Sequence, residues 1–538
     1  MKKTIAKYIV WVTLVVFSSC KLDGLQDNPN YIAQSQANID FLLNNVQVEF
    51  GNFFNNASSR GMELTRMRAL ISGANYNNAY QITTFDPMWE SFYSTSLPDF
   101  NKIIAQGEES GLYIHAGIAK VLKAYELVTM VDNFGDIPYS QALDPTNFNP
   151  QVDPAAGLYD TALGILDEAI ADFGKTSSAT VANDMFYAGS TKKWITAAKT
   201  IKLKIYLQRR LVDTNAKAEI QALITSGNID LIDAADGSED FVFTYPGNSI
   251  ANPDTRHPFF TDSYINGAGA YMSNSYMLAL YNGRGGFSDP RIRYYFYRQS
   301  TQEGTDVNLI SCYGLPAPAH YPAGSAWCQD PNGYWGRDHL NNDGTGPDNR
   351  VRTAYGLYPG GGKFDGSEGV QTTVNDGNKG KGIWPVLLSS FTYFMRAEAA
   401  LTLGTSDDAK LMLTTAVAQS ITKVTKFADV TSTRVPTTAA INGYEAAVAT
   451  DYDTAPEKLQ VVMKEYWVAA WGNGIEPYNG YRRTGYPNDL QPARNPQPGD
   501  FYRSLSYPSD FVTRNQNATQ HAVGAQVFWD TNPAGFIK

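Results

Sequence analysis

The sequence predicts a mainly α-helical protein in which a scaffold of packed helices is interrupted by one long, irregular insertion. Apolar residues recur three and four positions apart in several long windows, a spacing that places them on one face of a helix. The alternation typical of strands is scarce. The helical windows cover residues 116–130, 158–173, 194–211, 387–403, 407–424 and 459–471.

The windows 387–403 and 407–424 form a predicted helix pair. The first ends at Gly404, which suits the left-handed cap of a helix, and the second opens at Ser406 with two acids in its first turn. Small Ala and Gly residues at such a turn let the two helices pack closely. The pair resembles a tetratricopeptide unit, although the chain has no clean repeat of about 34 residues.

The insertion lies between Asp236 and Trp384, where the helical pattern gives way to Gly, Pro, Asn, Asp and Tyr. Loops of this length inside a compact protein usually carry function. We therefore expect recognition residues in this segment.

The composition indicates a folded protein. The 538 residues are 43% hydrophobic and only 18% charged, which argues against long charged tails. The formal net charge of −10 would repel a phosphate backbone, so we expect no nucleic acid partner. Aromatic residues make up 13%, and the 33 Tyr outnumber the 26 Phe, which favours exposed recognition surfaces.

Residues 1–19 are predicted to be a signal peptide. Three lysines precede an apolar run of about ten residues, too short to cross a bilayer, and the small residues Ser18 and Ser19 follow it. Cys20 then completes the pattern of a bacterial lipobox, in which the thiol carries a diacylglycerol and the freed amine a further acyl chain. The alternative is an ordinary secreted protein with a chance cysteine. Because no later segment approaches about eighteen uninterrupted apolar residues, the lipid is the only expected membrane contact.

Cys312 and Cys328 are the two remaining thiols of a chain that is expected to be exported. We expect them to form a disulfide, since closing a loop of this size stabilises by about 3 kcal/mol on the chain-entropy model. Two free buried thiols are the alternative. A catalytic cysteine is not supported, because the sequence shows no Cys/His pairing.

Short motifs follow one another through most of the chain after Cys20. They are Asp27-Asn-Pro-Asn30, Asn133-Phe-Gly-Asp-Ile-Pro-Tyr139, Asp184-Met-Phe-Tyr-Ala-Gly-Ser190 with Lys193-Trp194, Lys202-Leu-Lys-Ile-Tyr-Leu-Gln-Arg-Arg210, Arg396-Ala-Glu-Ala-Ala400, Glu465-Tyr-Trp467, Glu476-Pro-Tyr-Asn-Gly-Tyr-Arg-Arg-Thr-Gly-Tyr-Pro487, Arg503-Ser-Leu-Ser-Tyr-Pro508 and Val527-Phe-Trp-Asp530. In this order, after a lipobox, they resemble the SusD/RagB family of nutrient-binding outer-membrane lipoproteins. Within that family, Gly336-Arg-Asp-His339 and Tyr355-Gly-Leu-Tyr-Pro-Gly-Gly-Gly-Lys-Phe-Asp365 are most similar to the SusD-like 2 branch.

The resemblance implies a tetratricopeptide-like α-α superhelix that presents an irregular ligand-binding face. The expected layout is one nutrient-binding domain in residues 20–538, with the helical scaffold in residues 31–235 and 384–538 and the ligand-face insertion in residues 236–383. The implied partner is a SusC-like TonB-dependent transporter, whose barrel the protein would close as a lid at the cell surface. The implied activity is binding without bond breaking.

Aromatic residues on loops are the candidate ligand contacts. A ring can stack on the apolar face of a sugar while Asn, Asp and Arg hydrogen-bond to its hydroxyls, and a peptide could use the same rings. For any single ring, ordinary loop packing is the competing interpretation. The candidates are Tyr76 and Tyr80 in an Asn-rich loop, and Tyr313, Tyr321, Trp327, Tyr334, Trp335, Tyr355 and Tyr358 in the insertion.

Other prominent side chains favour a structural role. Arg482 and Arg483 beside Glu476 could bind an anion, but buried arginines more often satisfy helix-end carbonyls and a carboxylate. Packing is likewise expected for the tryptophans at helical spacing, Trp194, Trp384, Trp467 and Trp471.

Metal and catalytic patterns are weak. Asp330, Asp338 and Asp343 could hold Ca²⁺, but the run lacks the order of an EF-hand, and turn formation is the favoured interpretation, so we expect no cofactor. The five His residues have no paired spacing that would support a zinc hydrolase, and phosphate-loop and nucleophile-elbow motifs are absent. The sequence does not decide whether two carboxylates form a catalytic pair for glycoside hydrolysis, because such residues meet in space rather than in sequence. Two other functions therefore stay as alternatives: a lipid-anchored hydrolase of the same polymers, and a surface scaffold or adhesin without a small ligand.

Overall fold

A computed structural model describes residues 38–225, 230–247, 254–267, 269–343, 346 and 348–537. The predicted signal peptide, Cys20 and the first motif lie outside these residues. The longer helices are α2 Ile39–Leu64, α5 Leu97–Ser110, α6 Tyr113–Phe134, α7 Ala155–Phe173, α8 Thr191–Gln208, α9 Ala216–Thr225, α13 Ser389–Leu403, α14 Ala409–Thr425, α15 Thr438–Thr454, α16 Lys458–Ala469 and α17 Ile475–Thr484. The shorter ones are α3 Tyr76–Ala79, α4 Asp86–Glu90, α10 Pro258–Phe260, α11 Asn274–Asn282, α12 Ile292–Tyr295 and α18 Ser509–Arg514, together with π-helical turns Ser91–Ser96 and Thr261–Ile265 and a 3₁₀ turn Pro331–Gly333.

The predicted fold class is confirmed, because helices dominate the described residues and only four short strands accompany them. Each of the six predicted windows coincides with a helix to within a few residues. The helix pair is α13 and α14: Gly404 ends α13 in the left-handed conformation, and the carboxylate of Asp408 caps the first turn of α14. Leu387, at the start of one predicted window, belongs to a strand instead.

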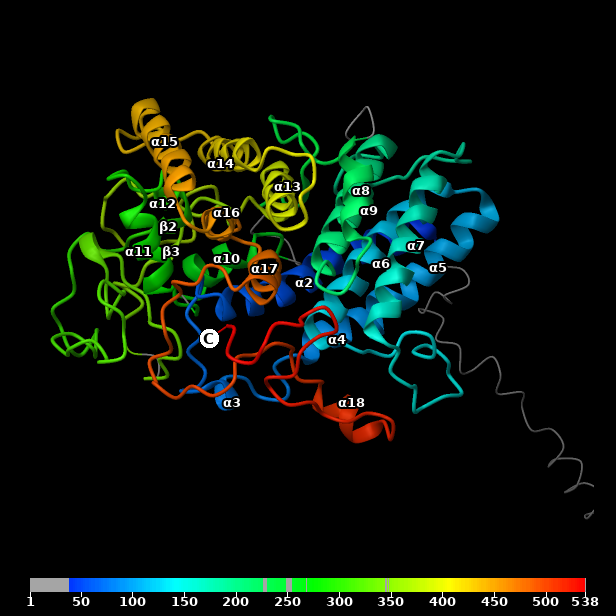
Figure 1. Ribbon diagram of the computed structural model, residues 1–538, viewed down its shortest axis with the longest axis horizontal. Helices are drawn as coiled ribbons and strands as arrows, with labels where there is room; N and C mark the ends of the chain where they lie inside the picture. Colours follow the sequence, from blue (N-terminus) through cyan, green and yellow to red (C-terminus); the bar gives the residue numbers. More distant parts are fainter. Residues whose placement is uncertain are drawn as a thin grey trace, which may run out of the picture.

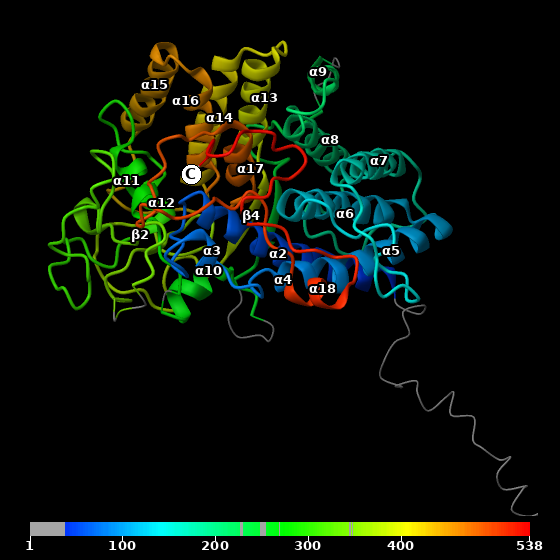
Figure 2. The ribbon, with the colours of Figure 1, turned by 60° about the horizontal axis from the view of Figure 1, so that its bottom comes forward.

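Two groups of helices meet at the central helix α2. In the first group α6 packs between α5 and α7, and α8 continues the row to α9; in the second group α13 packs on α14 and α16. Helix α2 contacts α5, α6 and α17, so it joins the two groups (Figures 1 and 2). Helix α6 is buried on all sides from His115 to Phe134, and its buried charged residues, such as Lys120 and Lys123, are hydrogen-bonded to neighbouring helices.

The insertion begins and ends in one antiparallel strand pair. Strand β1 (Phe241–Tyr245) pairs with β4 (Gly382–Leu387), with Phe243 opposite Trp384. Between them lie α10 to α12 and the short pair β2 (Phe296–Tyr297) and β3 (Ala354–Tyr355). The insertion is thus held at its base by a ladder of backbone hydrogen bonds, and it occupies the side of the molecule away from α5 to α9 (Figure 1).

Cys312 and Cys328 form a disulfide in the structure. The two sulfurs lie in a small apolar cluster with Ala69, Tyr271 and Trp335, separate from the main core. Among the described residues, no helix combines the length and the apolar character needed to cross a membrane.

Lys123 on α6 couples the stability of the fold to pH. Its ammonium group donates to Asn101 Oδ1 at 2.7 Å and lies 5.3 Å from the ring centre of Tyr139. Burial lowers the pKa of Lys123 from 10.5 to about 8. Between these two values the unfolded chain binds more protons than the native protein, so this group makes stability rise with pH in that window.

We therefore expect Lys123→Met to remove this rise. Urea unfolding of the wild type and the variant is measured between pH 8 and 10.5. The contribution of Lys123 is the change with pH in the difference between their unfolding free energies. The buried tyrosines, whose raised pKa values act in the opposite direction, contribute equally to both proteins. If the difference in unfolding free energy between wild type and variant is constant from pH 8 to 10.5, Lys123 is not the group responsible.

Candidate functional site

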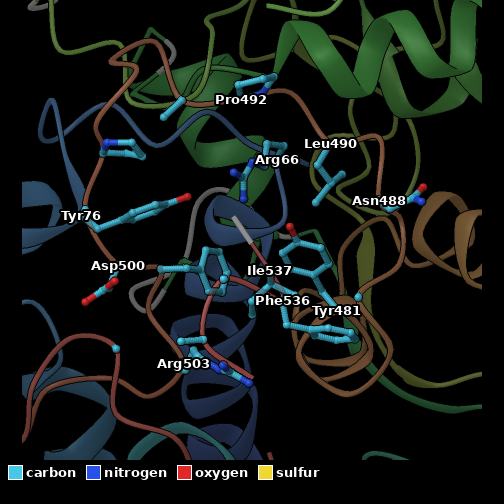
Figure 3. Close-up of a pocket in the computed structure, with 18 of the residues that line it drawn as sticks. Arg66, Tyr76, Tyr481, Asn488, Leu490, Pro492, Asp500, Arg503, Phe536 and Ile537 are labelled. Carbon is cyan, nitrogen blue, oxygen red and sulfur yellow. The ribbon is translucent and has the colours of Figure 1, made fainter. Parts of the chain in front are cut away.

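A pocket of about 1010 Å³ opens between the loop after α17, the C-terminal segment and the turn that follows α2. Figure 3 shows Tyr76 and Asp500 on one side of it and Tyr481 on the other, with Arg66 between them. The pocket draws on segments from both ends of the chain, and His320 and Pro322 add a contribution from the insertion. Its volume exceeds that of a single sugar ring and suits an extended ligand.

The loop after α17 is a stiff wall of this pocket. Gly485 ends α17 with a φ of 73°, a left-handed conformation that glycine adopts without strain. Pro492, Pro496 and Pro498 then restrict the backbone. The side chain of Gln491 donates to Asp338 Oδ1 at 2.7 Å and to the Ala326 carbonyl at 2.8 Å, which ties the loop to the insertion.

The base of the pocket is polar and fixed. Arg66 is buried, and its guanidinium donates to the carbonyls of Leu64 at 2.8 Å and Gln491 at 3.2 Å. Tyr76 Oη lies 2.9 Å from His339 Nε2. Burial raises the pKa of Tyr76 to about 12, and burial together with the charge of Arg66 lowers the pKa of His339 well below its ordinary value. Phenol and imidazole are therefore both neutral at physiological pH, and Arg66 supplies the positive charge of the base.

Aromatic rings form the walls above this base. Phe501 meets Tyr76 and Tyr481 edge to face, with ring centres 5.5 Å and 5.6 Å apart. Phe536, which packs against Gly485 and lines the pocket, is 39% exposed. Flat apolar walls beside a guanidinium suit a ligand that has apolar faces and polar edges.

The lining offers little for bond breaking. Asp500 is the one carboxylate among the described lining residues, whereas glycoside hydrolysis uses two. Ser504 lies beside the pocket with its Oγ 3.4 Å from His521 Nδ1, but this hydroxyl donates to the Ala525 carbonyl at 2.8 Å. The serine proton is thus directed away from the histidine, unlike that of an activated nucleophile.

The structure buries most of the candidate ligand rings, with exposed fractions of 8% or less. The Tyr80 hydroxyl donates to Glu63 at 3.0 Å, and the Tyr355 ring stacks on Phe259 with centres 3.9 Å apart. Packing against the scaffold therefore accounts for most of the surface of these rings. Tyr76 lines the pocket around Arg66 and Tyr355 lines a smaller one, and contact of the six rings with a ligand stays a prediction. The buried rings are Tyr76, Tyr80, Tyr334, Trp335, Tyr355 and Tyr358.

The other three candidates lie on the disulfide-closed loop. Tyr313 is 39% exposed, and Tyr321 and Trp327 are half-buried. None of the three lines the pocket, but their neighbour His320 does. Their contact with a ligand stays a prediction.

The arginine pair of α17 has the structural role that the sequence favoured. Arg482 donates to the Arg503 carbonyl at 2.7 Å, and Arg483 forms a two-pronged pair with Glu398 of α13 rather than with Glu476. Glu476 pairs with Lys204 at 2.7 Å. The four tryptophans at helical spacing, Trp194, Trp384, Trp467 and Trp471, are buried.

The three candidate calcium ligands do not share a site. Asp338 is buried and accepts from Asn274, Gln491 and the Cys328 N–H, whereas Asp343 pairs with Arg494 near the surface. Burial raises the pKa of Asp330 well above its usual range, which favours the neutral acid. No group of three or more His, Cys, Asp or Glu that could hold a metal ion occurs in the described part of the chain.

Sequence reasoning missed the residues that the pocket brings together. Tyr481 stood within a family motif and was assigned to the fold, and Phe501, Phe536 and His320 were not selected. The available signal was the run Gln491-Pro-Ala-Arg-Asn-Pro-Gln-Pro498, whose three prolines indicate a stiff loop between aromatic residues.

Two family profiles match consecutive parts of the chain. The profile described as "Starch-binding associating with outer membrane", SusD-like 2, matches residues 29–320, and the one described as "Susd and RagB outer membrane lipoprotein" matches residues 360–530. The chain belongs to the SusD/RagB family. The predicted resemblance and its SusD-like 2 branch are thereby confirmed. SusD/RagB proteins are outer-membrane lipoproteins that bind nutrients and are generally non-catalytic.

Solved structures of SusD/RagB proteins share the fold. A structure named as a chitin-binding protein superposes with a TM-score of 0.65 at 18% identity over 92% of this chain and 100% of that one. A SusD/RagB family protein from Bacteroides thetaiotaomicron gives a TM-score of 0.64 at 20% identity over 92% and 100%. A chitin-binding SusD homologue from Flavobacterium johnsoniae gives 0.63 at 17% over 91% and 99%. No curated protein sequence matches the chain.

Proposed function

We propose that this SusD/RagB protein captures an oligosaccharide in the pocket around Arg66, without cutting it, and delivers it to a SusC-like TonB-dependent transporter. The observation that carries the proposal is the lining of the pocket: Phe536 offers exposed ring surface, the buried rings of Tyr481 and Phe501 form the wall beside it, and Arg66 offers charge at the base. Sugars present apolar faces between polar edges, which matches this arrangement. A peptide is the second ligand class, because its side chains and backbone could use the same groups.

Two features support binding over hydrolysis. The described lining holds one carboxylate, Asp500, and the nearby Ser504 hydroxyl is engaged with a backbone carbonyl. Two of the solved relatives are named as chitin-binding, which makes chito-oligosaccharides the first ligands to test. The proposed anchor is a lipid at Cys20, with the protein exposed at the cell surface, and the protein is proposed to need no cofactor; the mass of the mature N-terminal peptide tests the acylation.

The decisive experiment measures binding and product formation together. Isothermal titration with chitohexaose, maltoheptaose and a set of peptides is expected to show saturable binding of one class, and chromatography of the same mixtures to show no cleavage products. Cleavage that is lost on changing Asp500 to Asn would favour a hydrolase instead. Absence of binding, together with failure to co-purify a TonB-dependent transporter, would favour a scaffold or adhesin.

Phe536→Ala is expected to weaken binding of the preferred ligand about tenfold, because a wall of apolar ring surface is lost. Since the ring is 39% exposed, the loss of unfolding free energy should be only about 1–2 kcal/mol. Titration and thermal unfolding of the same sample check both values. Phe148→Ala is the matched control: this ring is 82% exposed and does not line the pocket, so its removal should leave affinity unchanged. Equal affinities of the two variants would place the ligand elsewhere.

A further inference from the structure

The loop closed by Cys312 and Cys328 reaches the pocket with its tip. The loop has no regular secondary structure, and at its base Asn274 donates to the Cys328 carbonyl at 3.0 Å while the Cys328 N–H donates to Asp338 at 3.2 Å. At its far end His320 and Pro322 line the pocket. The disulfide and these hydrogen bonds therefore fix one end of a segment whose other end is a wall of the site.

The hydrogen bond that His320 makes determines what its ring can offer to a ligand. His320 Nε2 lies 2.9 Å from the carbonyl oxygen of Ala493, on the opposite wall. A carbonyl oxygen only accepts hydrogen bonds, so Nε2 carries the proton, and in the neutral ring Nδ1 is an acceptor. His320 is an exposed residue, and the hydrogen bond to Ala493 is the one that its ring makes among the described residues.

Two further rings hold the imidazole in place. The ring of Tyr321 meets His320 edge to face with centres 5.1 Å apart, and Trp327 meets Tyr321 in the same way at 6.1 Å. The indole N–H of Trp327 donates to the Leu315 carbonyl at 2.9 Å within the loop. Tyr321 packs on His320 and Trp327 packs on Tyr321, so both rings, which the sequence suggested as ligand contacts, help to orient the imidazole.

We propose that His320 is a specificity-determining residue that accepts a hydrogen bond from a ligand O–H or N–H group through Nδ1. The proposal rests on the proposed function of the pocket and adds to it an acceptor at the rim, complementary to the donor Arg66 at the base. The disulfide-closed loop orients this acceptor before the ligand arrives, which lowers the entropic cost of binding. The ligand class is a glycan that presents hydroxyl or acetamido N–H groups to the rim.

The test compares two glycans across matched variants of the full-length protein. Affinities for chitohexaose and maltoheptaose are measured by titration for wild type, His320→Ala, Tyr313→Ala and the double variant Cys312→Ser with Cys328→Ser. His320→Ala is expected to lower the affinity for the preferred glycan about tenfold. It should also change the ratio of the two affinities, because the two sugars present different hydrogen-bond donors. The double variant is expected to lower the affinities for both glycans by the same factor. Tyr313 lies on the same loop outside the pocket. If His320 carries the contact, Tyr313→Ala leaves both affinities unchanged; a loss in Tyr313→Ala alone would place the contact on that ring instead.

An unchanged affinity ratio in His320→Ala would overturn the assignment. Hydrogen exchange without ligand tests the anchoring separately: the double variant should exchange faster in residues 313–327 and, through the contact with Ala493, in residues 490–501. Unchanged exchange in both segments would refute the role of the disulfide. If the wild type binds no glycan, the proposed function and the role of His320 both fail, while the exchange result still decides whether the disulfide holds the loop.

Discussion

Replacing Glu398 with alanine is expected to lower the free energy of unfolding by about 3–5 kcal/mol. Glu398 on α13 is fully buried, and its carboxylate accepts from Arg483 of α17 at 2.6 and 2.7 Å and pairs with Arg210, just after α8, at 3.1 Å. Burial alone would raise the pKa of Glu398, but the two arginines outweigh it and the pKa is lowered. Without the carboxylate, two buried guanidinium groups would face each other uncompensated.

Urea unfolding of wild type and variant measures this loss. Glu398→Gln keeps the shape and one accepting oxygen, so it should fold and show an intermediate loss, which keeps the test valid if the alanine variant does not fold. Asp453→Ala is the control, since it breaks the Lys410–Asp453 pair, whose side chains are 42% and 56% exposed. An exposed pair contributes at most about 1 kcal/mol. A Glu398→Ala loss no larger than that of the control would contradict the expectation.

Gly474→Ala is expected to cost about 3 kcal/mol, because α2 and α17 approach each other too closely for a side chain. A Cβ at Gly474 would lie 2.0 Å from the Ser58 carbonyl oxygen, and one at Gly61 would lie 2.1 Å from the Gly474 carbonyl oxygen. The φ of Gly474 is −84°, a value that any residue adopts, so the cost is steric and not conformational. The contact also places the start of α17, and with it Tyr481, against the scaffold.

Gly157→Ala on α7 provides the matched comparison. A Cβ there meets nothing within 4 Å, and replacing a helical glycine with alanine should stabilise by about 0.5–1 kcal/mol. Chemical denaturation of both variants should therefore give changes of opposite sign. A Gly474→Ala variant within about 1 kcal/mol of wild type would show that the two backbones can separate without cost.

The helices that the sequence predicted are those whose apolar residues follow the helical period, such as α6 and α7. Helix α17 is instead poor in apolar residues: its ten residues include Glu476, Arg482 and Arg483, and nevertheless all ten are buried. Partners that are distant in sequence, Glu398 and Lys204, neutralise its charges. Periodicity detects burial that is driven by apolar residues, and it does not detect burial that depends on ion pairs.

The site was less predictable than the fold. An exposed recognition tyrosine and a packed one have the same composition and the same kind of neighbours in sequence, so Tyr355 and Tyr358 could not be distinguished from Tyr313. The pocket gathers Arg66, His320, Tyr481 and Phe536, which come from four distant segments of the chain. No local pattern records that these residues meet.

The order and spacing of the residues determined the helical class and the SusD/RagB family, since both are encoded in local periodicity or in short contiguous motifs. Only the tertiary structure decided which rings are buried, which carboxylate neutralises Arg483 and where the pocket lies. The physical reason is that burial and charge pairing depend on distances between segments, and these distances are set when α2, α17 and the insertion pack together.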